Sequence, residues 1–172
     1  MSQYPNDPAG TPVPPAQPPR KWPTVVGTIS AILGGLGVVC TPVNVGMQYV
    51  NPAQHQLLGT LPPWFQQYTL AGAAIGFVFA ALLLAAGLLV LKRRQLGRTL
   101  HLVYCAIGLI SAVVNVLVML TAFAAPGIDP NMKVGLAIGL GCGLPLGLAY
   151  MIFLLVWFLR RSIAEEVRQW PA

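Results

Sequence analysis

The chain has 172 residues, of which 56 % are hydrophobic and only 8 % are charged, and its mean hydropathy is +0.70. Soluble domains of this size carry about 25 % charged residues, so the composition excludes an ordinary soluble protein and predicts an integral membrane protein. Ten Lys and Arg against four Asp and Glu give a net charge of +6. The basic residues flank apolar segments rather than forming a patch, so we expect no nucleic-acid partner.

Residues 1–23 contain eight of the 16 prolines and few apolar side chains. Such a segment cannot bury enough surface to offset the entropy of ordering, so it predicts a disordered, proline-rich cytoplasmic tail. Within it, Pro15 to Arg20 matches the PxxPx(K/R) form that SH3-type domains bind. The match is short and arises easily in a tail this rich in proline, so we do not expect it to serve as a ligand.

The first predicted transmembrane helix covers about residues 24–45 and follows Arg20 and Lys21. Small residues recur on it at a spacing of four, which lets a neighbouring helix approach closely. We therefore expect helix packing at Gly27, Ala31 and Gly35, and the same spacing relates Ser30 to Gly34. An outer loop is predicted over 46–68, where prolines and amides disfavour a spanning helix and aromatic residues suit the membrane interface.

The second predicted helix covers 69–91, with Gly72 and Gly76 on one face. It ends in an inner basic loop over 92–99. Four basic residues in so short a loop place it in the cytoplasm and suit contact with anionic lipid headgroups. They are Lys92, Arg93, Arg94 and Arg98.

The third predicted helix, over 100–125, carries polar side chains at Ser111 and Asn115. Such groups in a membrane usually hydrogen-bond a neighbouring helix, and they are candidates for an interhelical or pore contact. His101 lies near the inner end of this helix, where we expect water to reach it. Ser30 and Ser111 then have no base partner among the predicted helices.

An outer turn is predicted over 126–133 and a fourth helix over 134–159. Four glycines at a spacing of four form one stripe along this helix and predict a packing surface. These are Gly135, Gly139, Gly143 and Gly147. A short cytoplasmic tail, 160–172, should continue the helix and pair Arg161 with Glu165.

Counting basic residues gives the orientation. Nine lie on one side of the predicted helices and Lys133 alone lies on the other, so both termini should be cytoplasmic. The prediction is an all-α, multi-pass protein of the cell membrane with four helices in an antiparallel bundle. The nine are Arg20, Lys21, Lys92, Arg93, Arg94, Arg98, Arg160, Arg161 and Arg168.

No Asp, Glu, Lys or Arg lies inside a predicted transmembrane helix. Pumps and coupled transporters place such groups in the membrane because the groups carry the coupling. The three cysteines, Cys40, Cys105 and Cys142, fall at different depths without a CxxC pair, and His55 has no neighbouring ligand. We therefore predict no catalytic residue, no metal and no cofactor.

The layout and the stretch Gly97 to Tyr104 resemble small uncharacterised four-span proteins of bacteria. The outline is also similar, more distantly, to the CD20-like tetraspans of animals. Claudin-like tetraspans carry a Cys pair in a long outer loop, and this loop has Trp64 but no Cys. The resemblance implies a four-helix membrane fold and brings no catalytic residue.

Three functions remain open from the sequence. The first is a non-enzymatic structural, assembly or partner-binding component, which binds itself or another membrane protein through small-residue surfaces. The second is a passive pore or small-molecule facilitator lined by Asn115, Ser111, Thr121 and Cys142. The third is a membrane sensor that contacts lipid through the basic loop.

Overall fold

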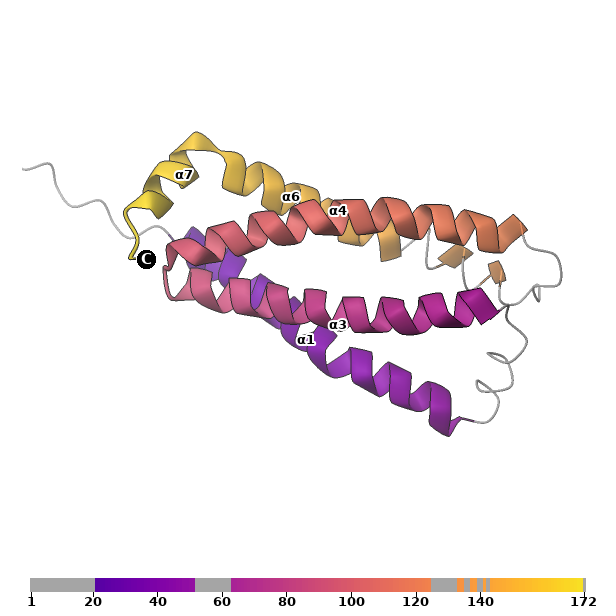
Figure 1. Cartoon of the computed structure of the whole chain (residues 1–172). Helices are drawn as coiled ribbons and strands as arrows, with labels where there is room; N and C mark the ends of the chain where they lie inside the picture. The colour runs from indigo at the N-terminus through magenta and orange to yellow at the C-terminus, as the bar shows by residue number, and fades with distance from the viewer. Residues whose placement is uncertain are drawn as a thin grey trace, which may run out of the picture.

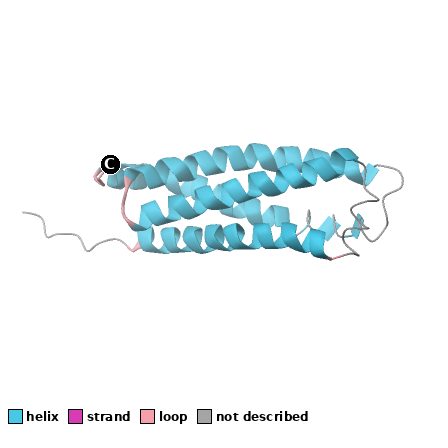
Figure 2. Cartoon of the chain, turned by 60° about the horizontal axis from the view of Figure 1, so that its bottom comes forward, coloured by secondary structure: helices cyan, strands magenta, loops and turns pink. Residues whose placement is uncertain are grey.

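The computed structural model describes residues 21–51, 63–124, 133–134, 137–138, 141 and 143–171. Over these ranges all regular secondary structure is helical, as predicted. Four helices run lengthwise in one elongated bundle, and a short fifth helix lies at one end (Figure 1, Figure 2). The helices are α1 (Trp22–Val50), α3 (Pro63–Leu91), α4 (Gln95–Ala124), α6 (Leu144–Leu159) and α7 (Arg161–Arg168).

Helices α1, α3 and α4 are long and apolar enough to cross a membrane, and α6 with α7 forms a fourth, bent candidate. At 1.5 Å per residue, a helix of 29 or 30 residues is about 43–45 Å long, against about 30 Å of hydrocarbon. Large apolar side chains point outward, and Val39, Val78 and Ile110 are 62–66 % exposed. Exposing such an apolar surface to water is unfavourable, whereas exposing it to lipid is not.

Helices α1, α3 and α4 extend beyond the ranges that the sequence predicted, whereas α6 begins at Leu144, inside the range predicted over 134–159. α1 continues through Pro42 to Val50, and α3 begins at Pro63, so both edges of the loop predicted over 46–68 are helical. Proline lacks an N–H and its fixed φ suits the first helical position, which allows Pro63 to begin a helix. α4 similarly begins at Gln95, inside the basic loop predicted over 92–99.

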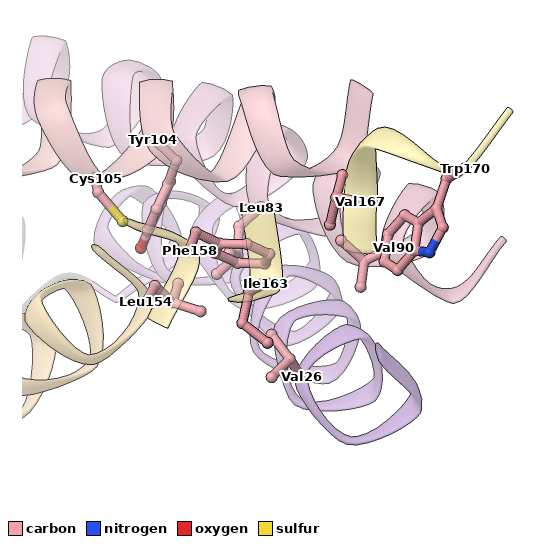
Figure 3. Close-up of a cluster of buried hydrophobic side chains, with 10 residues drawn as sticks. All are labelled: Val26, Leu83, Val90, Tyr104, Cys105, Leu154, Phe158, Ile163, Val167 and Trp170. Atoms are coloured by element: carbon pink, nitrogen blue, oxygen red, sulfur yellow. The ribbon is translucent and has the colours of Figure 1, made fainter. Parts of the chain in front are cut away.

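The chain turns sharply after α6 instead of continuing the helix into the tail. Arg160 has φ −59° and ψ 129°, and α7 is bent by 67° relative to α6. The apolar face of α7 explains the turn, because Ile163 and Val167 pack into the same buried cluster as Val26 and Val90 (Figure 3). The predicted pair of Arg161 and Glu165 is present, with Nε and Oε1 3.1 Å apart.

Helix α7 is also held by polar contacts. Trp22 Nε1 donates to a carboxylate oxygen of Glu166 at 3.0 Å, and the rings of Trp22 and Trp170 stack with centroids 5.5 Å apart. The side-chain amide of Gln95 donates to the carbonyls of Arg168, at 3.1 Å, and Trp170, at 2.7 Å. The segment after α6 therefore closes one end of the bundle. We call this end, which holds Trp22, the α3–α4 turn and α7, the basic end.

Backbone contact joins α1 to α3 near the basic end. A Cβ added at Gly34 would collide with the backbone nitrogen of Leu84, and one added at Gly87 would lie 2.6 Å from the backbone nitrogen of Ala31. At Gly46, in the other half of α1, an added Cβ would meet nothing within 4 Å. α1 accordingly diverges from the other helices toward Val50 (Figure 1).

The α3–α4 turn has a residue in a glycine-favouring conformation. Arg93 has φ +52°. Its N–H bonds the carbonyl of Val90 at 3.0 Å, and the next N–H, of Arg94, bonds the carbonyl of Leu89 at 2.9 Å. This is the Schellman pattern of a helix end, in which glycine usually takes the position that Arg93 occupies. A side chain there costs roughly 1–2 kcal/mol.

We predict that Gly34→Ala lowers the stability of the bundle by about 1–3 kcal/mol, because the added methyl group has no room against α3. Gly46→Ala is the matched control and should be neutral or stabilising by up to about 1 kcal/mol, since alanine favours a helix. Thermal unfolding in mild detergent measures both. Equal midpoints for the two variants would contradict the contact between α1 and α3.

Candidate functional site

A buried chain of hydrogen bonds joins three helices near the basic end. Ser30 of α1 and His101 of α4 are completely buried. The Ser30 hydroxyl oxygen lies 2.9 Å from Nε2 of His101 and 2.8 Å from the phenol oxygen of Tyr150, on α6. Nδ1 of His101 lies 2.7 Å from the carbonyl oxygen of Gly97. Polar groups from α1, α4 and α6 thus meet at one point.

The proton positions follow from the acceptors. A carbonyl can only accept, so Nδ1 of His101 carries the hydrogen that it donates to Gly97. In a neutral imidazole Nε2 is then an acceptor, and the Ser30 hydroxyl donates to it. The Ser30 oxygen in turn accepts from the hydroxyl of Tyr150. Each side-chain polar atom in this series of hydrogen bonds is paired, which removes the cost of burying these groups in an apolar region.

This arrangement corrects two expectations from the sequence. We expected water at His101, but its ring is fully buried, with its centroid 4.9 Å from that of Phe158. We also expected no base near Ser30, whereas His101 lies within hydrogen-bond distance of it. The sequence missed the contact because helical periodicity places a side chain on a face but does not identify the helix opposite.

Ser30 and His101 have the hydroxyl–imidazole contact that also activates serine nucleophiles. The two residues are completely buried, and the Ser30 oxygen also accepts a hydrogen bond from Tyr150. The described structure therefore has no room for a substrate beside this hydroxyl. The geometry suits a structural connection between helices better than catalysis.

Above this layer, away from the basic end, the bundle opens into a cleft between α3, α4 and α6. Its volume is about 750 Å³. At its floor, Phe79 and Tyr104 make an edge-to-face contact with centroids 5.8 Å apart, and the sulfur of Met151 packs over Gly108. Most of the wall is aliphatic, aromatic or glycine. The lining residues include Ile75, Gly76, Asn115, Gly147, Leu148 and Met151.

Four of the glycines predicted for helix packing line this cleft. They are Gly72 and Gly76 on α3, and Gly143 and Gly147 at the start of α6. A Cβ added at any of them would meet nothing within 4 Å. These glycines therefore make no close helix contact with the described residues, and their absent side chains widen the cleft instead.

Asn115 and Ser111 also line the cleft, where the sequence placed a polar interhelical or pore contact. The Asn115 side chain is exposed, and no hydrogen bond to it is found from the part of the chain that the structure describes. Thr121, the second hydroxyl proposed for a pore, instead donates to the carbonyl of Val118 at 2.7 Å. The Asn115 amide therefore lies on a largely apolar wall, where it can hydrogen-bond a bound molecule.

Of the other residues predicted for helix packing, some lie in close contact with α3 and others do not. Gly27 lies against α3, where an added Cβ would be 2.8 Å from Cγ of Leu91, while one at Gly35 would make an ordinary contact 4.0 Å from Leu84. The backbone of Ala31 faces Gly87. Gly135, Gly139, Cys142 and Arg20 lie outside the described residues, and so does the segment from Pro15 to Arg20, which we do not expect to bind SH3-type domains.

Among the residues that the structure describes, no three His, Cys, Asp or Glu side chains gather in a way that could hold a metal ion. Cys105 is buried and Cys40 is exposed, and both are free thiols.

No family model matches the chain, and comparisons with curated proteins and with solved structures give no match. The resemblance to bacterial four-span proteins stays a prediction.

We predict that Ser30→Ala destabilises the protein by about 1–3 kcal/mol, because it leaves buried polar atoms of His101 and Tyr150 unpaired. Ser111→Ala is the matched control: that hydroxyl lines the cleft, and its loss should leave the unfolding midpoint unchanged. Thermal unfolding in detergent, followed by tryptophan fluorescence, distinguishes them. If Ser30→Ala unfolds at the wild-type temperature, the buried chain does not hold the helices together.

Proposed function

We propose that the chain is a four-span integral membrane protein of the cell membrane with both termini in the cytoplasm. α1, α3 and α4 supply three spans, and α6 with the residues before it supplies the fourth. α7 is better placed at the membrane surface, because Arg161, Glu165, Glu166 and Arg168 would be costly in hydrocarbon. The concentration of Lys and Arg at the basic end supports a cytoplasmic position for that end.

Within this fold, the protein is a non-enzymatic binding protein that holds a small hydrophobic molecule of the bilayer in the cleft. The observation that supports this function is the unfilled space of about 750 Å³ between α3, α4 and α6. Sites for small ligands typically measure about 300–1,000 Å³ and have mostly apolar walls. An apolar space open to lipid will not hold water, so hydrocarbon is its natural content.

The length of the cleft suits an extended hydrocarbon chain. Along α4 the cleft is lined from Tyr104 to Met119, which is about 22 Å at 1.5 Å per residue. An acyl or isoprenoid chain fits along a cleft of this length.

Asn115 favours a molecule with one hydrogen-bonding group. An unpaired amide in hydrocarbon is unfavourable, and a hydroxyl or carbonyl of the bound molecule would pair with it. This preference separates an amphiphile, such as a fatty alcohol or an ester, from a plain alkane.

The passive pore is the second candidate, because Asn115 and Ser111 lie on the cleft wall. A pore also needs an opening at the basic end. There the completely buried side chains of Val90, Leu154 and Phe158 fill the space between the helices. Within the described residues, the single chain therefore suits binding better than conduction.

We predict that Gly147→Leu weakens binding of a fluorescent fatty acid by at least about tenfold, because about 1.4 kcal/mol of contact is lost when the new side chain occupies the cleft. Gly46→Leu, which adds the same side chain in open space outside the cleft, should bind as the wild type does. Titration of the purified protein in mild detergent measures both. Equal affinity of the two variants would refute the cleft as the binding site.

A further inference from the structure

Positive charge from separate segments gathers at the basic end, on the opposite side of the buried layer from the cleft. In the described residues this end carries eight Lys or Arg side chains and two carboxylates, Glu165 and Glu166. Both carboxylates are engaged: Glu165 pairs with Arg161, and Glu166 accepts the indole hydrogen of Trp22. Among the described residues of this end, positive charges therefore outnumber carboxylates by eight to two.

Two contacts bring together helix ends that carry basic residues. Nε of Arg98, on α4, donates to the carbonyl of Phe158 at 3.1 Å, two residues before Arg160. Gln95, two residues after Arg93, holds the carbonyl of Arg168 at 3.1 Å. The α3–α4 turn thus lies beside the end of α7, and Arg98 lies beside the end of α6. We call Lys92, Arg93, Arg98, Arg160 and Arg168 the basic patch.

The backbone conformation of Arg93 indicates that the arginine side chain is not needed for the fold. At φ +52°, within a Schellman helix end, glycine would serve the fold better than arginine. The position nevertheless carries a long cationic side chain, which is exposed. A residue held in an unfavoured conformation suggests a use for its side chain. Here the side chain adds charge beside Lys92.

The expected position of the basic patch relative to the membrane indicates which anion it would bind. Lys92 follows directly on α3, whose 29 residues contain no charge. The guanidinium of Arg160 lies over the ring of Trp157, 5.3 Å from its centroid, and Trp is enriched at the level of the headgroups. A phosphate at this depth belongs to a phospholipid.

We propose that the basic patch binds the phosphate of an anionic phospholipid in the leaflet at the basic end. This site is separate from the cleft and does not depend on the function proposed for it. Guanidinium groups pair with phosphate oxygens by two parallel hydrogen bonds. Arg93 and Arg160 supply such groups from two helix ends, and the ring of Trp157 lies under the Arg160 guanidinium.

The test uses the full chain in detergent, with phosphatidylglycerol and phosphatidylcholine as the two probes and native mass spectrometry to count bound lipid. The wild type should retain phosphatidylglycerol in preference to phosphatidylcholine. Arg93→Gly should bind phosphatidylglycerol about fivefold more weakly, the effect of one basic residue at a membrane surface. Without lipid the variant should unfold at the wild-type temperature or above it, because glycine suits the turn.

The control Lys133→Gly removes one positive charge outside the basic patch and should bind phosphatidylglycerol as the wild type does. If Arg93→Gly is poorly folded, Arg160→Gln provides the same comparison on a helix end without a positive φ. Equal retention of the two lipids, or undiminished phosphatidylglycerol binding by both variants, overturns the proposal. It also fails if inorganic phosphate at millimolar concentration competes fully with the lipid, because the site would then take a free anion.

Discussion

Three hydrogen bonds, from Tyr150 to Ser30, from Ser30 to His101 and from His101 to the Gly97 carbonyl, join α1, α4 and α6 inside an apolar bundle. Helices in lipid gain little from hydrophobic association, so paired polar groups and close packing hold them together. Here both act at the same depth, because Gly27 and Gly87 bring α1 onto α3 beside Ser30. As a consequence, the helices are packed closely together near the basic end.

The rest of the structure follows from this one closed end. Where the polar chain and the glycine contacts stop, α1 diverges (Figure 1) and the space between α3, α4 and α6 is left unfilled. At the other side of the buried layer, α7 adds Ile163 and Val167 to the core (Figure 3), while Arg161, Glu165 and Arg168 are exposed. One end is thus suited to bind hydrocarbon, and the other is suited to bind headgroups.

The sequence was sufficient for the helical class and for the presence of several helices long enough to cross a membrane, because long uncharged segments bounded by basic residues leave few alternatives. It was insufficient for side-chain partners. Small residues at a spacing of four occur both at Gly27, which touches a helix, and at Gly76, which faces open space. Ser30 and His101 are 71 positions apart, and only the crossing of α1 with α4 and α6 brings them together. The turn of α7 depends on the same tertiary contacts.

Photolabelling tests the open cleft most directly. The protein would be placed in nanodiscs with a phospholipid that carries a diazirine on its acyl chain, and the adducts would be mapped by mass spectrometry. An occupied cleft predicts adducts concentrated on inward residues such as Ile75, Leu148 and Met151. Adducts confined to outward residues such as Leu36, Val39 and Val78, with none in the cleft, would contradict the account.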